Sequence, residues 1–315
     1  MSVDVTIRAL RETDLPEADR IFRLAFGTFM GLPDPLRFAG DSDWTRTRWR
    51  ARPEAAFGAE VGGELVGSNF AARWGSVGFF GPLTVRPDHW DRGIARRLLE
   101  PTMALFERCG TTHTGLYTFA QSPKHVALYQ KFGFHPRFLT AIMGKVVDHA
   151  RVAPGVGRYS EVPAAERGRV LAECRTLTDA LYPGLDLADE IGAVAAQGLG
   201  DTVLLREAGD LVGLAVCHCG AGSEAGSGSC YVKFGAVRPC PDPSALFERL
   251  LTACEALAAA RDTAFLVAGV NLARDDAYRR MRARGFRTEV QGVAMHRPNE
   301  PGYSRADRHV IDDWR

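Results

Sequence analysis

Residues 79–99, FFGPLTVRPDHWDRGIARRLL, predict a strand, a turn and a helix in succession. The apolar, β-prone part ends at Val85, Pro87 begins the turn, and Leu99 belongs to an apolar helix pattern. The first N–H groups of a helix have no earlier carbonyl to bind, and the helix dipole favours an anion at that end. We therefore predict a diphosphate-binding loop at residues 90–95, with an ordinary strand-to-helix turn as the alternative.

Two small residues in this loop, Gly93 and Ala95, would let a diphosphate approach the backbone closely. The pattern Val-x-Pro, six residues, Gly-Ile-Ala and then Leu-Leu resembles the acetyl-CoA loop of the GNAT superfamily of N-acetyltransferases. That loop usually has the form Gln/Arg-x-x-Gly-x-Gly/Ala, and here Trp90 replaces its first residue. The replacement removes a side chain but leaves the backbone donors in place.

A second block, residues 122–134 (SPKHVALYQKFGF), is similar to the later family motif Asn-x-x-Ala-x-x-Leu-Tyr-x-x-x-Gly-Phe. Ser122 stands where Asn is common. The resemblance implies that Tyr129 is the general acid that protonates the leaving sulfur, and a core tyrosine is the alternative. The resemblance also implies an acetyl-CoA site made by Leu83, Thr84, Val85, Asp91, Arg92, Gly93, Ile94, Ala95, Arg96 and Ser122.

The rest of residues 1–150 predicts one mixed sheet. The element order is strand, helix, three strand runs, the loop and its helix, then strand, helix and further strands, which indicates an α/β protein (an α+β mixed sheet). Pro82 has no N–H for a sheet ladder, so strand pairing should weaken there. The expected strands are residues 5–8, 56–61, 65–73, 77–85 and 115–119, with the last strands of the sheet in 134–147.

The second half of the chain repeats the first. The tripeptide Val-Arg-Pro at 85–87 recurs at 237–239, and Gly-Phe at 133–134 recurs at 285–286, both at an offset of 152 residues (from 85 to 237 and from 133 to 285). A repeat in matching order indicates tandem copies of one fold. With a linker at 148–158, we predict two tandem GNAT-like domains, each a mixed, mostly antiparallel sheet flanked by helices. The first, 1–150, is the catalytic domain with the acetyl-CoA loop, and the second, 151–315, is degenerate.

The loop is altered in the second copy. At the same offset, Gly93 and Ala95 correspond to Ala245 and Phe247, and Pro243 precedes the helix. A phenylalanine at this position would occupy the space that a diphosphate needs. We therefore expect one acetyl-CoA per chain and a second domain that shapes the acceptor pocket.

Composition restricts the partners. The chain has 315 residues, 46% of them hydrophobic, and a formal net charge of +1, which gives no general attraction to nucleic acid or acidic membranes. Seven cysteines do not suggest a disulfide framework, and no secretory signal or membrane-spanning run is evident. We expect a cytoplasmic protein with no nucleic-acid or membrane partner, and a homo-oligomer is compatible with the sequence.

Two further patterns have competing interpretations. Cys217, His218, Cys219 and Cys230 could suggest zinc, but alternate residues of a strand face opposite ways, so we expect no metal. Residues 41–53 contain Trp44, Arg46, Arg48, Trp49, Arg50 and Arg52. They could form a cationic, aromatic wall of the acceptor pocket, but the interpretation we favour from sequence is a solvated helix face.

The predicted function is transfer of an acetyl group from acetyl-CoA to a primary amine of an unidentified small molecule or peptide. The alternative is a non-catalytic acyl-CoA sensor or scaffold, while aminoacyl transfer from tRNA is disfavoured because it does not require the loop. The general base is left open among Glu54, Glu60, Glu64, His113, His125, a water chain and the carboxylate of Arg315, whose location the sequence does not indicate.

Overall fold

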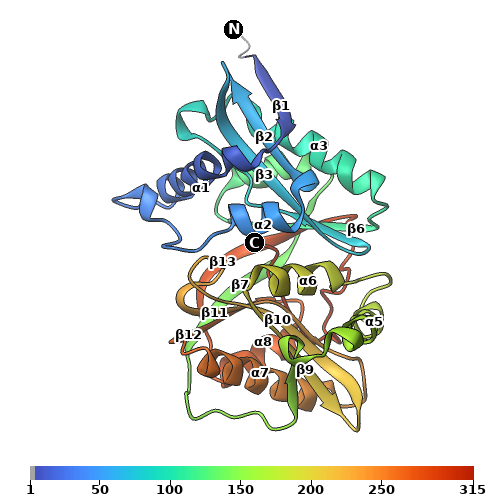
Figure 1. Ribbon diagram of the computed structural model, residues 1–315. Coiled ribbons are helices and arrows are strands. Elements are labelled where there is room, and N and C mark those ends of the chain that lie inside the picture. Colours follow the sequence, from blue (N-terminus) through green and yellow to red (C-terminus); the bar gives the residue numbers. More distant parts are fainter. Residues whose placement is uncertain (1–3) are drawn as a thin grey trace.

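The computed structural model describes residues 4–315, and its element order repeats once along the chain (Figure 1). The first half contains β1 (Val5–Ala9), α1 (Leu15–Phe29), α2 (Thr45–Ala51), β2 (Ala56–Val61), β3 (Glu64–Trp74), β4 (Val77–Phe80), β5 (Thr84–Val85), α3 (Ile94–Arg108), β6 (His113–Thr118), α4 (Pro123–Gln130) and β7 (His135–Val146). The second half contains β8 (Val156–Arg158), α5 (Arg167–Asp179), α6 (Ala188–Gln197), β9 (Gly200–Glu207), β10 (Asp210–Gly220), β11 (Gly226–Val237), α7 (Pro243–Ala260), β12 (Phe265–Asn271), α8 (Asp275–Ala283), β13 (Arg287–Arg297) and β14 (Val310–Ile311).

The strands form one continuous mixed sheet that passes through both halves. Its order is β1-β2-β3-β4-β6-β13-β7-β12-β11-β10-β9-β8, with β5 paired to β3 and β14 paired to β11. Within the described residues, the pairs β4–β6 and β11–β12 are parallel and the other pairs are antiparallel. The predicted mixed, mostly antiparallel sheet flanked by helices is confirmed.

Helices cover both faces of the sheet because neighbouring strand residues point to opposite sides. Leu65 of β3 packs under α1 with Ile21, whereas the next residue, Val66, packs under α3 with Ile94 and Leu98. The amphipathic patterns of these helices therefore bury their apolar sides on opposite faces of the same strand.

The two halves exchange strands in the middle of the sheet. Strand β13 of the second half lies between β6 and β7, and β7 lies between β13 and β12, so both neighbours of β7 come from the second half. The prediction that residues 134–147 supply the last strands of the first sheet is therefore wrong in part. These residues form the single strand β7, and the remaining strand beside β6 is β13.

The halves also share a hydrophobic core. The ring of Trp74 in β3 lies 4.5 Å from Phe79 in β4 and 5.3 Å from Phe234 in β11, measured between ring centroids. These rings belong to one buried cluster that includes Trp314 near the C-terminus. The second half thus supports the strands of the first half directly.

A local break in the sheet is important for the site. The ladder of β4 with β3 and β6 ends by Phe80, and pairing to β3 resumes only at Thr84. Residues 81–83 between them include Pro82, which has no N–H to donate. The expected weakening of the pairing at this point is confirmed, and β5 diverges from β6.

No helix within residues 4–315 is long and apolar enough to cross a membrane.

Candidate active site

A cavity of about 950 Å³ opens at the break between β5 and β6. Its wall combines α1, the β4–β5 connection, the beginning of α3, β6 and α4 with residues of the second half that include Glu224, Ala225, Tyr231, Trp314 and Arg315. The cavity is lined by Leu83, Thr84, Val85, Asp91, Gly93, Ile94, Ala95, Arg96 and Ser122, all from the predicted acetyl-CoA site. Arg92 is exposed and is not part of the lining.

The beginning of α3 has the geometry of an anion site. Gly93 is the N-cap of this helix and has a φ of 76°, a left-handed conformation in which a side chain would be strained. No atom lies within 4 Å of where a Cβ would be at Gly93, so the space in front of the helix is open. At the rim, Lys124 forms an ion pair with Asp91. Because both side chains are largely exposed, this pair contributes little to stability.

Tyr129 lies in α4 with its side chain in the cavity wall and an exposed fraction of only 8%. Its ring is 5.8 Å from that of Phe80, at the end of β4. Burial raises the pKa of Tyr129, and a smaller effect of the Thr118 side chain opposes this rise. The phenol therefore keeps its proton at neutral pH and is available as a proton donor.

The segment 41–53 contributes to the cavity, contrary to the solvated face that we favoured from sequence. Arg48 is buried, with 7% of its area exposed, and Trp44 lines the cavity. Arg46 and Arg50 are exposed, as a solvated face predicts. The periodicity could not distinguish these positions, because the buried partners of Arg48 come from the second half of the chain.

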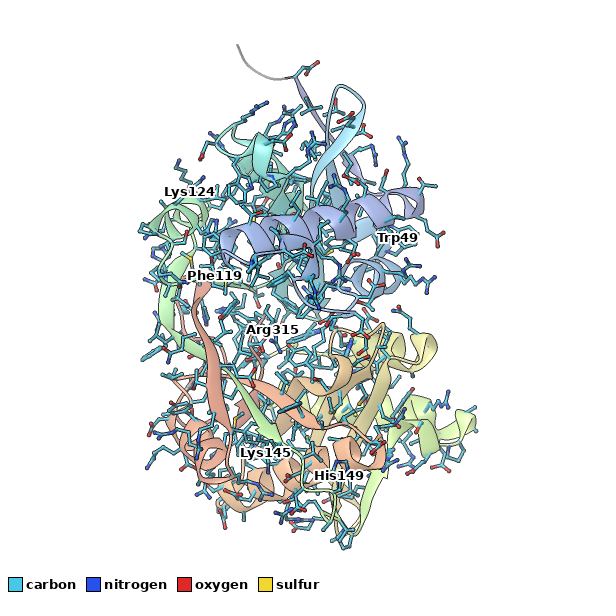
Figure 2. The ribbon with its side chains drawn as sticks, turned by 90° about the vertical axis from the view of Figure 1, so that its left-hand side faces the viewer. Trp49, Phe119, Lys124, Lys145, His149 and Arg315 are labelled. Atoms are coloured by element: carbon cyan, nitrogen blue, oxygen red, sulfur yellow. The ribbon has the colours of Figure 1, made fainter. Side chains whose placement is uncertain are left out.

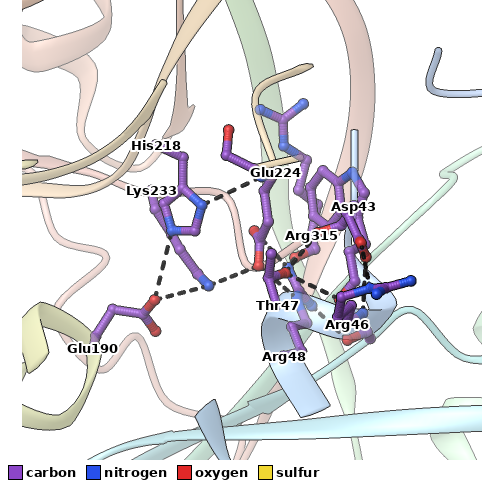
Figure 3. A network of polar contacts seen from close by, with 12 residues as sticks. Asp43, Arg46, Thr47, Arg48, Glu190, His218, Glu224, Lys233 and Arg315 are labelled. Carbon is purple, nitrogen blue, oxygen red and sulfur yellow. Dashed lines mark hydrogen bonds and ion pairs between the residues drawn. The ribbon is translucent and has the colours of Figure 1, made fainter. Parts of the chain in front are cut away.

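Those partners form a network of charges (Figure 3). Arg48 binds both carboxylate oxygens of Glu224, from Nε at 2.9 Å and Nη2 at 3.1 Å. Lys233 Nζ lies 2.8 Å from Glu224 and 2.9 Å from Glu190. Burial alone would raise the pKa of Glu190, but the charge of Lys233 and a hydrogen bond with His218 overcome this effect and hold it at about 2. Two carboxylates and two cations therefore compensate each other in a buried network beside the cavity, which Glu224 lines.

Arg48 also connects this network to the strand break and to the C-terminal segment. It donates to the backbone oxygens of Gly81 and Arg315. The guanidinium of Arg315 lies 4.2 Å from the centroid of the Tyr231 ring. Figure 2 shows Arg315 between the two halves of the molecule. Arg315 was a candidate from the sequence without a location, and neither Glu224 nor Tyr231 was predicted to belong to the site.

The candidate general bases differ in whether they line the cavity. His125 and Arg315 line the cavity, whereas Glu54, Glu60, Glu64 and His113 do not. Burial, aided by the neighbouring charge of Lys124, lowers the pKa of His125. A neutral imidazole at this position can accept a proton.

The equivalent gap in the second half is closed. Strand β11 continues through Val237, and β14 pairs with it at Gly235 and Ala236. Phe247 is completely buried beside this segment, with its ring 5.4 Å from that of His309. The altered loop that we predicted for the second copy is thus accompanied by an inserted strand.

Arg274 holds the inserted strand from the position that corresponds to Ser122 (offset 152, from 122 to 274). It is 1% exposed, donates to the Val310 carbonyl at 2.7 Å and forms an ion pair with Asp312. A buried guanidinium thus occupies the place where the first half has a small residue lining the cavity.

The cysteine-rich strand β10 has the predicted alternation. The sulfur atoms of Cys219 and Cys230 lie 3.4 Å apart, while Nδ1 of His218 accepts from the Glu224 N–H on the other side. Within residues 4–315, no group of three or more His, Cys, Asp or Glu side chains is arranged to hold a metal ion.

Residues 18–134 match the model of the acetyltransferase (GNAT) family. An acetyltransferase candidate from Pyrococcus horikoshii is 14% identical, with a TM-score of 0.69 over 98% of this chain and 95% of its own. A GCN5-related N-acetyltransferase from Sphaerobacter thermophilus is 15% identical, with a TM-score of 0.59 over 93% of this chain and 95% of its own. A glucosamine N-acetyltransferase region of a fungal multi-domain β-N-acetylglucosaminidase is 15% identical, with a TM-score of 0.63 over 93% of this chain and 38% of its own.

No curated protein matches the chain in sequence. The structural matches share the fold across nearly the whole chain, and the family match lies on the half that contains the cavity. Residues 18–134 therefore match a GNAT acetyltransferase domain, and the protein is an acyltransferase enzyme.

Proposed function

We propose that this enzyme transfers an acetyl group from acetyl-CoA directly to a primary amine, with Tyr129 as the general acid. The observation that carries the proposal is the meeting of three features in one cavity: the strand break at 81–83, the open beginning of α3 and the buried Tyr129. In this proposal residues 1–150 form the catalytic domain, and residues 151–315 form a tandem GNAT-like domain without a cofactor site.

The residues of the first half fit acetyl-CoA by size and by charge. The free N–H groups of the first turn of α3 would bind the diphosphate, because no earlier carbonyl is available to them. Gly93 and Ala95 keep that approach open. The backbone of 83–85, beside the strand break, would bind the pantetheine arm and polarise the thioester carbonyl.

Acetyl-CoA supplies the acetyl group as a thioester. The amine nitrogen forms the new bond to the carbonyl carbon, the carbon–sulfur bond breaks, and the Tyr129 hydroxyl gives its proton to the sulfur. The raised pKa of Tyr129 favours the protonated form that this step needs. The amine loses its proton to His125 or to water, and His125 is favoured over the glutamates because it lines the cavity.

Calorimetric titration with acetyl-CoA tests the donor site. The native chain should saturate at one acetyl-CoA per chain, and Ala95→Phe should abolish binding because the new ring fills the approach to α3. Arg97→Phe is the matched control, since Arg97 is exposed on the same helix and does not line the cavity. Unchanged affinity in folded Ala95→Phe, or saturation at two per chain, would contradict the proposal.

A further inference from the structure

Part of the wall of the cavity that Tyr129 lines is aromatic, and we call this part the aromatic compartment. Its rings are Phe26, Phe29, Phe38, Trp44, Tyr117 and Phe119. All six side chains are only half-buried although they line the same cavity. Aromatic surface left open to a concave site usually marks the place of an apolar ligand.

The rings of this wall contact one another. Phe26 and Phe38 stack at 5.3 Å with an angle of 14° between their planes. Phe29 lies 4.9 Å from Phe119. These contacts come from three separate segments, namely α1, the loop after it and the end of β6, so the wall is built by tertiary packing. A rigid aromatic wall binds a flat apolar group with little loss of side-chain entropy.

The charged groups at this end are already compensated within the protein. Glu224 is bound by Arg48 and Lys233, and Arg315 pairs with Asp313 at 3.3 Å while its guanidinium covers Tyr231. Among the described residues of the lining, the other acidic side chains are Asp91, which pairs with Lys124, and Glu289, which is exposed on β13. The main-chain oxygen of Arg315 accepts from Arg48. A substrate with several positive charges would therefore find no buried free carboxylate to replace its hydration.

From this wall and this charge balance we propose that the acceptor is a primary amine attached to an aromatic or similarly flat apolar body, without a second charge. The inference rests on the acetyl transfer proposed above and specifies its substrate class. The apolar body occupies the aromatic compartment and directs the amine toward Tyr129. Release of water from the rings favours this class, whereas polyamines and aminoglycosides would be desolvated without compensation.

The test compares phenethylamine with spermidine at saturating acetyl-CoA, with released thiol as the readout. We expect kcat/KM to be at least about 10-fold higher for phenethylamine, a ratio of the size that apolar pockets achieve. Phe38→Ala and Phe29→Ala should each lower kcat/KM for phenethylamine about 10-fold, mainly through KM, and leave the affinity for acetyl-CoA unchanged. Phe265→Ala is the matched control, because Phe265 is exposed on β12 and does not line the cavity.

A higher kcat/KM for spermidine, or wild-type kinetics in both cavity variants, would overturn the substrate class and leave acetyl transfer intact. Failure of acetyl-CoA to bind in the titration would instead contradict the donor site. If acetyl-CoA binds and neither amine reacts, calorimetry of phenethylamine with the protein–CoA complex decides the question. Binding that weakens in Phe38→Ala supports the aromatic compartment, and absence of binding overturns it.

Discussion

The two halves of the chain differ most at one equivalent place, the gap beside the strand that precedes the long helix. In the first half, β5 diverges from β6 and the gap opens into the cavity. In the second half, β14 pairs with β11 and fills the gap, and Phe247 packs behind it. The same order of elements thus occurs once with a ligand-sized opening and once with a protein segment in the corresponding position.

The inserted segment has a second structural effect. After β14 the chain continues through Trp314 to Arg315, and both residues line the cavity of the first half. The segment that closes one gap therefore helps to build the wall beside the other. One short segment, residues 310–315, thus closes the gap of the second half with its first two residues and completes the cavity of the first half with its last two.

The largest expected effect comes from separating the halves. Residues 1–147 expressed alone should show no cooperative thermal unfolding and no activity, because β7 loses β12 and β13, and β6 loses β13. Circular dichroism melting and thiol release measure this, with the full chain as the reference. A fragment that melts cooperatively and retains full activity would show that the exchanged strands are dispensable.

Loss of a tyrosine hydroxyl should affect kcat strongly in the first half and hardly at all in the second. Tyr129→Phe should lower kcat by about 10²–10⁴-fold without changing the affinity for acetyl-CoA, because only proton transfer is removed. Tyr278→Phe is the matched control from the second half, where the residue packs partly buried against the core. Wild-type kcat in Tyr129→Phe would make this tyrosine a packing residue and remove it from the mechanism.

Closure of the second gap should depend on Arg274. Arg274→Met leaves Asp312 buried without its partner, and a broken buried ion pair costs about 3–5 kcal/mol of unfolding free energy. Urea denaturation measures this loss, and Arg279→Met on the exposed side of α8 serves as the control. Adding Asp312→Leu should recover part of the stability. An unchanged unfolding free energy in Arg274→Met would mean that β14 is held by other contacts.

The smallest expected effect is a loss of folding stability at acidic pH, caused by two buried histidines where β6 pairs with β13. His113 Nε2 and His296 Nδ1 lie 3.1 Å apart there. Burial lowers the pKa of His113 to about 4, with a further contribution from the charge of Arg137, and burial lowers that of His296 to about 3. Both rings are neutral in the folded state, whereas the unfolded chain takes up protons near pH 6.5.

The folded state therefore binds fewer protons than the unfolded state below pH 6.5, and stability should fall as pH decreases from about 6.5 toward 4. The loss is on the order of 1–3 kcal/mol for each histidine. Urea denaturation at several pH values measures it, and His113→Phe should reduce the slope. An identical slope in that variant would assign the acid sensitivity to other groups.

Local features of the fold could be predicted from the sequence. Strand β2 was predicted with its observed limits, Ala56–Val61, and the break at Pro82 followed from the missing N–H. The turn before α3 was predicted from Gly93. The structure explains this glycine by its left-handed backbone conformation and not by a lack of space, because the space around it is open. These features depend on residues that are neighbours along the chain.

Other features depend on partners far apart in the chain. Arg48 looked like one of several exposed arginines, but its carboxylate partner is 176 positions away. Residues 134–147 have the composition of a strand, yet nothing in them indicates that both neighbouring strands come from the second half. The aromatic compartment likewise combines rings whose side-by-side placement no sequence spacing predicts.

By itself, the sequence determined the element types, the repeat and the loop before α3, because backbone conformation and periodicity are local properties. Only the tertiary structure decided which strands pair across the middle of the sheet, that β14 closes the second gap, and which charges are buried beside the cavity. Strand pairing and the burial of charges depend on how apolar surface is buried and charge is compensated over the whole molecule. The local pattern does not decide them, because many strand pairings satisfy the same local pattern.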